Sequence, residues 1–457
     1  MVGAHPGLGT LPGMDESSEK RIQTIVEVLE DAFGGLMEAD PAAFRGKYRK
    51  MAKDPHAFYR GTACLFYRDV TAGLVDELTG RGDDFTDARS SRIWVHGDLH
   101  VENFGTYLAS DGRLVFDIND FDEAYVGSYT WDLLRFAASL SLTGWQKALP
   151  EDDVRGLVEV YVRAYVDQVR RYREDHDDDF ALTLDNTEGP IHEALQAARQ
   201  NRRAELLDAN TTRDGEGRVF LEDGTIRRLD DEERGRVVDA YRRYLDSLPA
   251  DKRRGDLFHE LHDVAGKSGF GIGSAGLPAY SLLIEGDSQA LDNDRILSMK
   301  QANVPAVSRY VDTDAVEEYF EHEGQRTVVS QRALQAHTDP LLGWTDVDGV
   351  GYVVSEVSPY EEDLEWADLT EPDEIRSVVE LLGRATAKIH CASDTDSDQD
   401  LVDFQVEDAV GAVLEGRDDE LVAWLQDAGE AYARQVRTDH ALFVEAFRSG
   451  RISVSAT

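Results

Sequence analysis

The chain has 457 residues, of which 41% are hydrophobic and 9% aromatic, and this composition is typical of a folded protein with about two to four compact units. Its 90 acidic and 48 basic residues give a net charge of −42. This charge excludes the net basic face that nucleic-acid binding requires, so we expect no nucleic-acid partner. Only nine basic residues are lysines, and this acidic, lysine-poor composition indicates a halophilic protein from a salt-rich cytoplasm, where charge repulsion is screened.

The termini and cysteines predict a cytoplasmic protein without a membrane partner. Residues 1–18 lack the basic and apolar regions of a signal peptide, and we expect them to form a flexible leader. No run reaches the roughly 18 apolar residues that a membrane-spanning helix requires. Cys64 and Cys391 are far apart and fit no metal-binding spacing, which favours a reduced compartment.

The first predicted unit, residues 19–150, mixes helices with two short strands. Apolar residues spaced by three and four predict a helix over residues 19–37, and further helical stretches over 58–78 and 129–145. Between the last two, residues 91–98 form an apolar strand that ends in a turn. A hairpin-type turn at Asp111-Gly112 then leads into a second strand over 112–120.

Three further segments follow. Residues 151–255 read as a charged helical segment with a small polar hairpin over 218–229. Residues 256–360 contain a glycine-rich turn, a strand over 295–302 with Lys300 near its end, a helix, and a buried strand over 351–359. Residues 361–457 are helical again, and we expect them to pack on the first unit.

The polar loop after the first strand, HGDLHVEN, carries the clearest chemical signal. Asp98 and Asn103 are five positions apart in this loop. A carboxylate there can accept the proton of an attacking hydroxyl, and an amide oxygen five residues later can bind a divalent metal on nucleotide phosphates. Catalytic loops of kinases divide the work in this way, so Asp98 is the candidate catalytic residue and Asn103 a candidate metal ligand.

The following acidic stretch is similar to a motif of aminoglycoside-phosphotransferase-like kinases. It offers Asp117, Asp120 and Asp122, and DFDEAYVGSYTWD reproduces that family's spacing between Asp120 and Asp132. The resemblance implies that Asp120 is the metal ligand, with Asp117 as the reserve. It also implies that Asp132 accepts backbone hydrogen bonds that hold the catalytic loop in shape.

Together these motifs resemble the protein-kinase-like superfamily. With MAKDPHAFYRGTA (Met51 to Ala63) and GIGSAG, the chain also resembles the prokaryotic family called domain of unknown function 2252, from about Lys50 to His390. That family supplies a relationship but no activity. The kinase resemblance implies an α+β, two-lobed kinase-like fold with additional helical segments.

The glycine run Gly271, Gly273 and Gly276 fits the same interpretation. Glycines let backbone amides approach phosphates, and Lys300 on a following strand can pair with those phosphates. A GxGxxG pattern alone is equally compatible with an ordinary hairpin turn. Kinases place these features before the catalytic loop, whereas here they follow it, so the chain is expected to be circularly permuted. Glu356 and Val357 then belong to the linker strand beside the nucleotide, and the acidic partner of Lys300 is sought among Glu317, Glu321 and Glu323.

The leading hypothesis is an ATP-dependent phosphotransferase that uses ATP and Mg²⁺ on a small-molecule or protein acceptor that the sequence does not determine. One alternative is a metal-dependent hydrolase that uses His96, Asp98 and His100 as ligands. Another is a nucleotide-binding pseudokinase. His96 is otherwise expected to brace the loop, and His100 to be a solvated residue or a substrate contact. Arg60 is expected either to bind phosphate or to hold a carboxylate.

Overall fold

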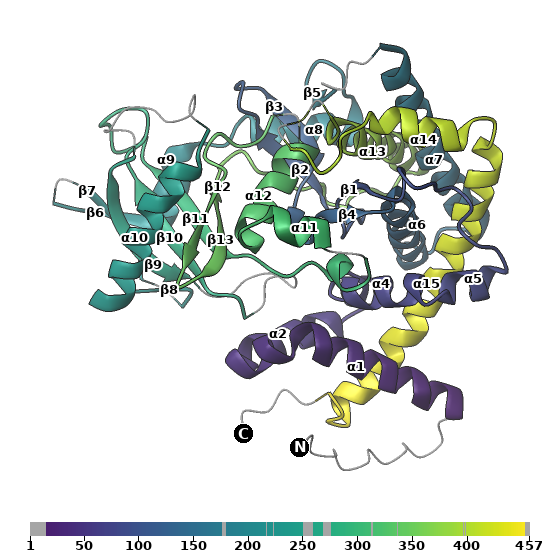
Figure 1. Cartoon of the computed structure of the whole chain (residues 1–457). Helices are drawn as coiled ribbons and strands as arrows, with labels where there is room; N and C mark the ends of the chain where they lie inside the picture. The colour runs from purple at the N-terminus through teal and green to yellow at the C-terminus, as the bar shows by residue number, and fades with distance from the viewer. Residues whose placement is uncertain are drawn as a thin grey trace.

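The computed structural model describes residues 15–175, 180–215, 217–222, 224–249, 259–267, 276–311, 314–335, 337–395, 397 and 399–452. Within these residues helices dominate and strands form several small sheets, which confirms the expected α+β class. Figure 1 shows a helical half beside a half built on the largest sheet. In the described part of the chain, every helix is too short or too polar to cross a membrane.

The helical half is built from the two ends of the chain. Its helices are α1 (Glu16–Ala39), α2 (Pro41–Met51), α3 (Pro55–Arg60), α4 (Ala63–Thr71), α5 (Leu74–Thr79), α6 (Tyr129–Gln146), α7 (Glu151–Asp175), α8 (Gly189–Ala198), α13 (Pro372–Ala392), α14 (Val406–Leu414) and α15 (Asp418–Arg448). Its strands are β1 (Ile93–Val95) paired with β4 (Tyr125–Gly127), and the sheet of β2 (Phe104–Leu108), β3 (Leu114–Ile118) and β5 (Leu182–Thr183). The hairpin predicted around Asp111-Gly112 is confirmed, since β2 pairs with β3 across it.

Helix α1 shows how local sequence produces this half. Asp15 caps the helix by accepting a hydrogen bond from the backbone N–H of Ser18, so the helix begins at Glu16, within the predicted leader. Its apolar residues at spacings of three and four are buried against α4 and α15. Arg21, on the same helix, pairs with Asp69 and Asp439, each at 2.6 Å, and thereby ties three helices together.

The sheet half is organised around one antiparallel sheet, in the order β12-β13-β11-β10-β9-β8. Its elements are α9 (Arg203–Asn210), β6 (Thr211–Asp214), β7 (Gly217–Phe220), β8 (Ile226–Arg227), α10 (Asp231–Ser247), β9 (Leu261–Lys267), β10 (Ala279–Ile284), β11 (Arg295–Gln301), β12 (Gly343–Val347) and β13 (Val350–Glu356). Three elements lie toward the helical half: the 3₁₀ turn η3 (Ala306–Arg309), α11 (Asp314–Tyr319) and α12 (Glu323–Leu334).

One expectation about the middle of the chain was wrong among the described residues. The hairpin predicted over 218–229 does not form, because β7 pairs with β6 across a turn that contains Gly215 at φ 61°, while β8 pairs with β9. The helices of residues 151–255 divide between the two halves. The tyrosine-rich face of α7 packs against α13, whereas Val237, Ala240 and Tyr244 of α10 belong to the core of the sheet half.

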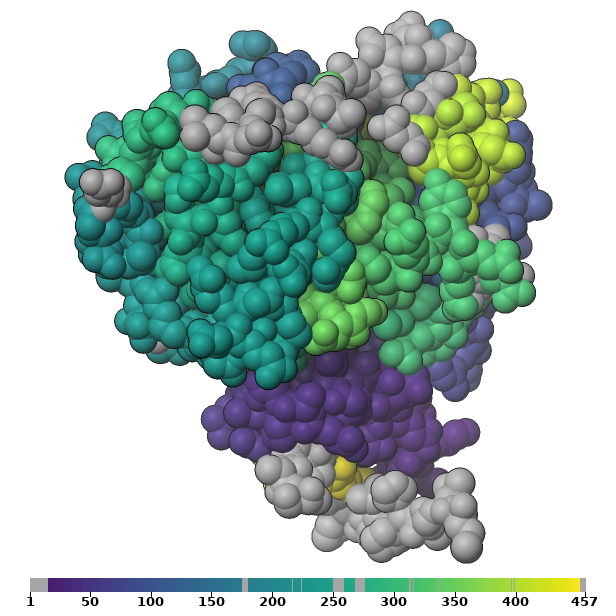
Figure 2. All heavy atoms as spheres, turned by 60° about the vertical axis from the view of Figure 1, so that its left-hand side comes forward, coloured from purple at the N-terminus to yellow at the C-terminus, as the bar shows by residue number. Residues whose placement is uncertain are grey.

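The chain enters and leaves the sheet half at neighbouring points. Arg203, the first residue of α9, forms an ion pair with Glu356, the last residue of β13. The sheet half is therefore a continuous insertion between two parts of the helical half. Figure 2 shows the N-terminal helices, in purple, packed beneath the sheet half, in teal.

Candidate active site between the two halves

The loop after β1 is held by Asp132, at the start of α6. Asp132 is fully buried and accepts hydrogen bonds from the backbone N–H groups of His96 (2.6 Å) and Gly97 (3.1 Å). Its carboxylate also lies 3.2 Å from Nε2 of His390, and although burial alone would raise its pKa, these partners lower it. A carboxylate therefore fixes the start of the HGDLHVEN loop.

Gly97 allows this loop to pass close to a second loop. Its φ is 82°, and a Cβ added there would lie 2.1 Å from the carbonyl oxygen of Glu123. His96 joins the same two loops: its Nε2 donates to the carbonyl of Asn119 at 2.9 Å, and its Nδ1 accepts from the N–H of Asp98 at 3.3 Å. The imidazole is thus engaged on both nitrogens as a brace.

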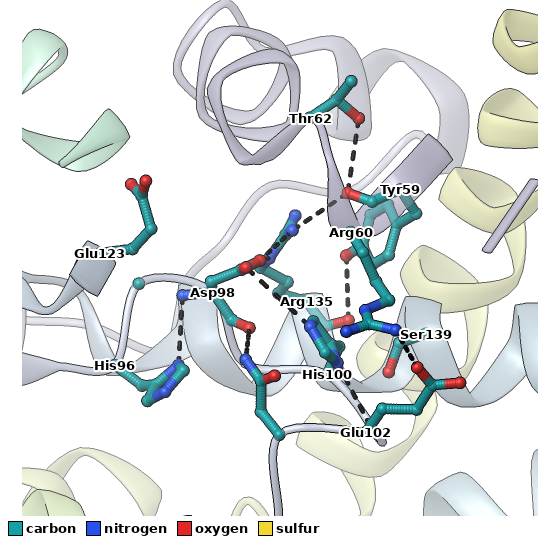
Figure 3. A network of polar contacts seen from close by, with 12 residues as sticks. Tyr59, Arg60, Thr62, His96, Asp98, His100, Glu102, Glu123, Arg135 and Ser139 are labelled. Carbon is teal, nitrogen blue, oxygen red and sulfur yellow. Dashed lines mark hydrogen bonds and ion pairs between the residues drawn. The ribbon is translucent and has the colours of Figure 1, made fainter. Parts of the chain in front are cut away.

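Asp98 forms an ion pair with a buried arginine, Arg135, as Figure 3 shows. Arg135, on α6, is 0% exposed and donates to Oδ1 of Asp98 from Nε (2.8 Å) and from Nη2. The same guanidinium donates to the carbonyl of Tyr59 and stacks on the Tyr59 ring, 4.3 Å from its centroid. Burial opposes the charge of Arg135, but Asp98 and the other nearby acidic groups outweigh it and raise its pKa.

The histidine set proposed for a metal-dependent hydrolase does not converge. His100 is 2% exposed, its Nδ1 accepts from the N–H of Glu102, and its Nε2 lies 3.9 Å from Asp98. Burial, followed by the charge of Arg60, lowers its pKa well below the usual value. Its burial contradicts the first of the two roles expected for His100, a solvated residue, and leaves the second, a substrate contact, as a prediction. In the described part of the chain, the group with metal-ligand geometry is His262, Glu285 and Asp294, which lies in the sheet half.

Arg60 is engaged with a carboxylate. It forms an ion pair with Glu102, whose other oxygen lies 3.6 Å from Nδ1 of His56. This arrangement matches the second of the two roles that the sequence left open for Arg60.

Two of the three predicted metal ligands are enclosed by protein. Asn103 is 3% exposed and donates from Nδ2 to the carbonyl of Asp98 at 2.8 Å, which leaves its Oδ1 as the atom available to a cation. Asp117 lies on β3 and forms a buried ion pair with Lys388 of α13. Because Lys388 already neutralises that carboxylate, Asp117 is a weaker candidate for a metal than Asp120.

Asp120 has the geometry expected of a functional residue. Its backbone is left-handed, with φ 60° and ψ 71°, a strained conformation for a residue with a side chain, and such strain concentrates at functional sites. The side chain is exposed to a cavity but surrounded by protein. This desolvation, followed by the charge of Asp122, raises its pKa. Of the described residues, none donates a hydrogen bond to its carboxylate.

Lys300 pairs with a residue of the loop that follows β3, Asp120 to Glu123, here called the acidic loop. It lies on β11 and forms an ion pair with Asp122, although the two residues are 178 positions apart. The prediction that Lys300 pairs with Glu317, Glu321 or Glu323 is therefore wrong. Glu323 pairs with Arg326 at 2.5 Å. Burial opposes the charge of Lys300, but Asp122 and Asp120 outweigh it and raise its pKa.

Helix α12 connects the acidic loop to the sheet half through the hydrogen bonds of Arg326. Arg326 is 2% exposed and donates to the backbone carbonyls of Asp122 (2.9 Å), Ala124 (2.5 Å) and Asn303 (2.9 Å). Glu123 in turn accepts from the N–H of Ala306, and burial raises its pKa to about 7. Arg135 and Arg326 could not be predicted as site residues from the sequence, because a single arginine within a helix does not indicate which loop it will contact.

A cavity of about 420 Å³ separates β11 and β13 from the β2–β3 hairpin. Asp120, Asp122 and Lys300 line it together with Glu356. Two further carboxyl groups in its wall are desolvated, which raises the pKa of Asp339 to about 6 and that of Glu361 to about 7. We call this space the large cavity.

A cavity of about 40 Å³, here the small cavity, adjoins the same acidic loop. Asp120 and Asp122 line both cavities, whereas Asp98 lines only the small one. Helices α1 to α4 supply the opposite wall through Phe33, Lys47, Arg60 and Cys64. The acidic loop therefore separates two spaces, one facing Lys300 and the other facing Asp98.

The structure describes only some of the predicted nucleotide-binding residues. Gly271 and Gly273 lie outside the described residues, while Gly276 has φ +80° and packs against Phe44 of α2. The backbone N–H of Glu356 donates to Asp339 and that of Val357 donates to Ile296. Glu356 also pairs with Arg203 and Arg295, so both linker residues are engaged within the protein.

One family matches the chain over residues 39–446, and it is described as "Uncharacterized protein conserved in bacteria (DUF2252)". The chain belongs to the DUF2252 family. No curated protein and no solved structure matches it. The range shared with the DUF2252 family runs from α1 to α15 and includes the residues of both cavities named above, apart from Phe33.

Proposed function

We propose that this DUF2252 protein is an ATP-dependent phosphotransferase with a circularly permuted, two-lobed kinase-like arrangement. The observation that carries the proposal is the meeting of Lys300 with Asp122 and Asp120 at the wall of the large cavity, with Asp98 on the other side of the same loop. In kinases a strand lysine, a metal-binding aspartate and a catalytic aspartate converge on the transferred phosphate. Residues far apart in this chain converge in a similar way.

The order of elements in the sheet half supports the proposal. After the two-residue edge strand β8, the sheet continues with β9 and β10, which flank the glycine-rich segment, and with β11, which carries Lys300 as the third strand counted from β9. Helices α11 and α12 come after β11. Kinases likewise place the lysine on their third strand and a helix after it. The kinase lysine pairs with a glutamate of that helix, whereas here it pairs with Asp122 and the helix holds the acidic loop through Arg326.

The residues present fit a nucleotide with a divalent cation. Asp120 lines both cavities, so its carboxylate could bind a cation there. Asn103 forms its hydrogen bond through Nδ2, which leaves its Oδ1 as a second oxygen ligand. These are the oxygen ligands that Mg²⁺ prefers, and the cation would neutralise phosphate charge in acidic surroundings. Lys300 in the large cavity would hold the phosphates, as a point charge on a strand.

Asp98 would serve the acceptor. Arg135 fixes its carboxylate, so it can orient an acceptor hydroxyl without moving. In the transfer, the hydroxyl oxygen bonds to the terminal phosphorus while the bond from that phosphorus to the bridging oxygen of ADP breaks. The hydroxyl proton passes to the carboxylate of Asp98.

Calorimetric titration with Mg²⁺ and a non-hydrolysable ATP analogue, in high-salt buffer, tests the proposal. We expect saturable binding by the unaltered protein and binding weakened about 10- to 100-fold in Lys300→Met, because a charge-assisted contact to phosphate is lost. Lys20→Met changes the same charge on the exposed face of α1 and should bind normally. Absence of nucleotide binding in the unaltered protein would refute the proposal, whereas binding without any transfer would indicate a pseudokinase.

A further inference from the structure

Lys47 is a buried lysine in the wall of the small cavity. It lies on α2, is 3% exposed, and its ammonium sits 3.7 Å from the centroid of the Phe33 ring. Of the described residues, none accepts a hydrogen bond from Lys47 or forms an ion pair with it. An ammonium has three donors, and leaving all of them without acceptors inside a protein is unfavourable.

Most of the other charged groups of the small cavity are already engaged, and the exception is Asp120, the candidate metal ligand. Arg60 pairs with Glu102, and Arg309 pairs with Asp31 at 2.9 Å. Among the acids, Asp98 is held by Arg135 and Asp122 by Lys300. Lys47 is thus the cation in this wall whose hydrogen-bonding capacity is open to a ligand.

The electrostatic surroundings keep Lys47 a cation at neutral pH. Burial lowers its pKa to about 8, and the neighbouring Cys64, Glu123 and Asp98 partly oppose that shift. A bound anion would further stabilise the protonated form. The aromatic face of Phe33 holds the ammonium on one side but cannot replace an oxygen acceptor.

We propose that the small cavity is the acceptor site, and that it binds a small alcohol carrying an oxyanion group, with the oxyanion on Lys47 and the hydroxyl on Asp98. This inference rests on the proposed phosphotransferase function and adds the class of its acceptor. The hydroxyl oxygen would attack the terminal phosphorus beside Asp120, which lines both cavities. The bond from that phosphorus to the bridging oxygen would break, ADP would leave into the large cavity, and Asp98 would take the proton. The small volume of this cavity, about 40 Å³ against about 420 Å³ for the large cavity, favours a small acceptor.

A matched set of two-carbon alcohols tests the class directly: glycolate is anionic, ethylene glycol neutral and ethanolamine cationic. Glycerol 3-phosphate, added as a fourth probe, distinguishes a phosphate from a carboxylate. Because the chain has nine lysines, selective ¹⁵N labelling of lysine side chains gives a spectrum simple enough to assign Lys47 with Lys47→Arg. We expect glycolate or glycerol 3-phosphate, but neither uncharged nor cationic probe, to raise the pKa of Lys47 in the protein without nucleotide.

Calorimetry with variants completes the test. Lys47→Met should weaken binding of the anionic probe about 10- to 100-fold, while the affinity for the ATP analogue stays within about twofold because Lys47 does not line the large cavity. Lys47→Arg should retain part of the affinity. Lys50→Met is the matched control, since Lys50 is exposed on the same helix, and it should change neither affinity.

The outcomes separate this inference from the proposed function. Preference for ethanolamine, or unchanged glycolate and glycerol 3-phosphate binding in Lys47→Met, would overturn the anionic acceptor even if nucleotide binds. A shift of the Lys47 signal with the ATP analogue alone, and with none of the alcohols, would assign Lys47 to the transferred phosphate instead. Failure of nucleotide binding with intact glycolate binding would refute the phosphotransferase and leave an anion site.

Discussion

Replacing Asp98 by asparagine should affect stability as well as catalysis. The substitution keeps the shape of the side chain but removes the charge that faces Arg135, which is 0% exposed. Breaking one side of a buried ion pair costs about 3–5 kcal/mol. The side chain of Asp98 is 16% exposed and the asparagine oxygen can still accept a hydrogen bond, so we expect the lower end, about 3 kcal/mol.

Urea unfolding and a phosphate-transfer assay measure the two effects separately. Phosphoryl transfer should fall by about 10²- to 10⁴-fold in Asp98→Asn, the range that a positioned acid–base group contributes. The double variant Asp98→Asn with Arg135→Met removes the unpaired cation and should regain most of the lost stability, with transfer remaining low. This pattern assigns the loss of activity to Asp98 and not to unfolding.

Two results would contradict this reasoning. Transfer at the normal rate in Asp98→Asn would show that the carboxylate has no part in the reaction. An unchanged unfolding midpoint in the single variant, or a further drop in the double variant, would show that the ion pair with Arg135 does not govern the stability of the loop.

Three further predictions follow from charge, two from buried carboxyl groups and one from the net charge of the chain. Burial raises the folded-state pKa of Glu123 to about 7. The protonated carboxyl therefore stabilises the folded state fully below pH 4.5, and this contribution is lost as the pH rises through about 7. In Glu123→Gln, the free energy of unfolding should depend less on pH between 4.5 and 7. Asp132→Asn leaves buried N–H donors of the HGDLHVEN loop without a full acceptor, so urea unfolding should show a loss of about 2–3 kcal/mol and the loop amides should exchange faster with solvent. The net charge of −42 should make the melting temperature rise steeply between 0.1 and 2 M KCl, and a flat salt profile would refute the halophilic interpretation.

The sequence allowed prediction of the elements around the site better than of their contacts. The strand before Asp98, the hairpin before Asp120 and the strand that carries Lys300 were all predicted, because apolar runs and turn residues mark them locally. The partners could not be predicted, since Arg135 and Lys388 lie within helices whose orientation depends on tertiary packing. The acidic partner of Lys300 was sought on the helix that follows its strand, but the insertion of the sheet half brings the lysine to Asp122 instead.

The insertion joined at Arg203 and Glu356 also constrains the order of folding during synthesis. The helical half begins with α1 but needs α13 and α15 to supply His390 for Asp132 and Asp439 for Arg21. The sheet half, by contrast, is translated without interruption and can form its core before α13 emerges from the ribosome. We therefore expect chains truncated near residue 360 to carry a protease-resistant sheet half, while the HGDLHVEN loop acquires its native shape only when α13 has docked and supplied His390.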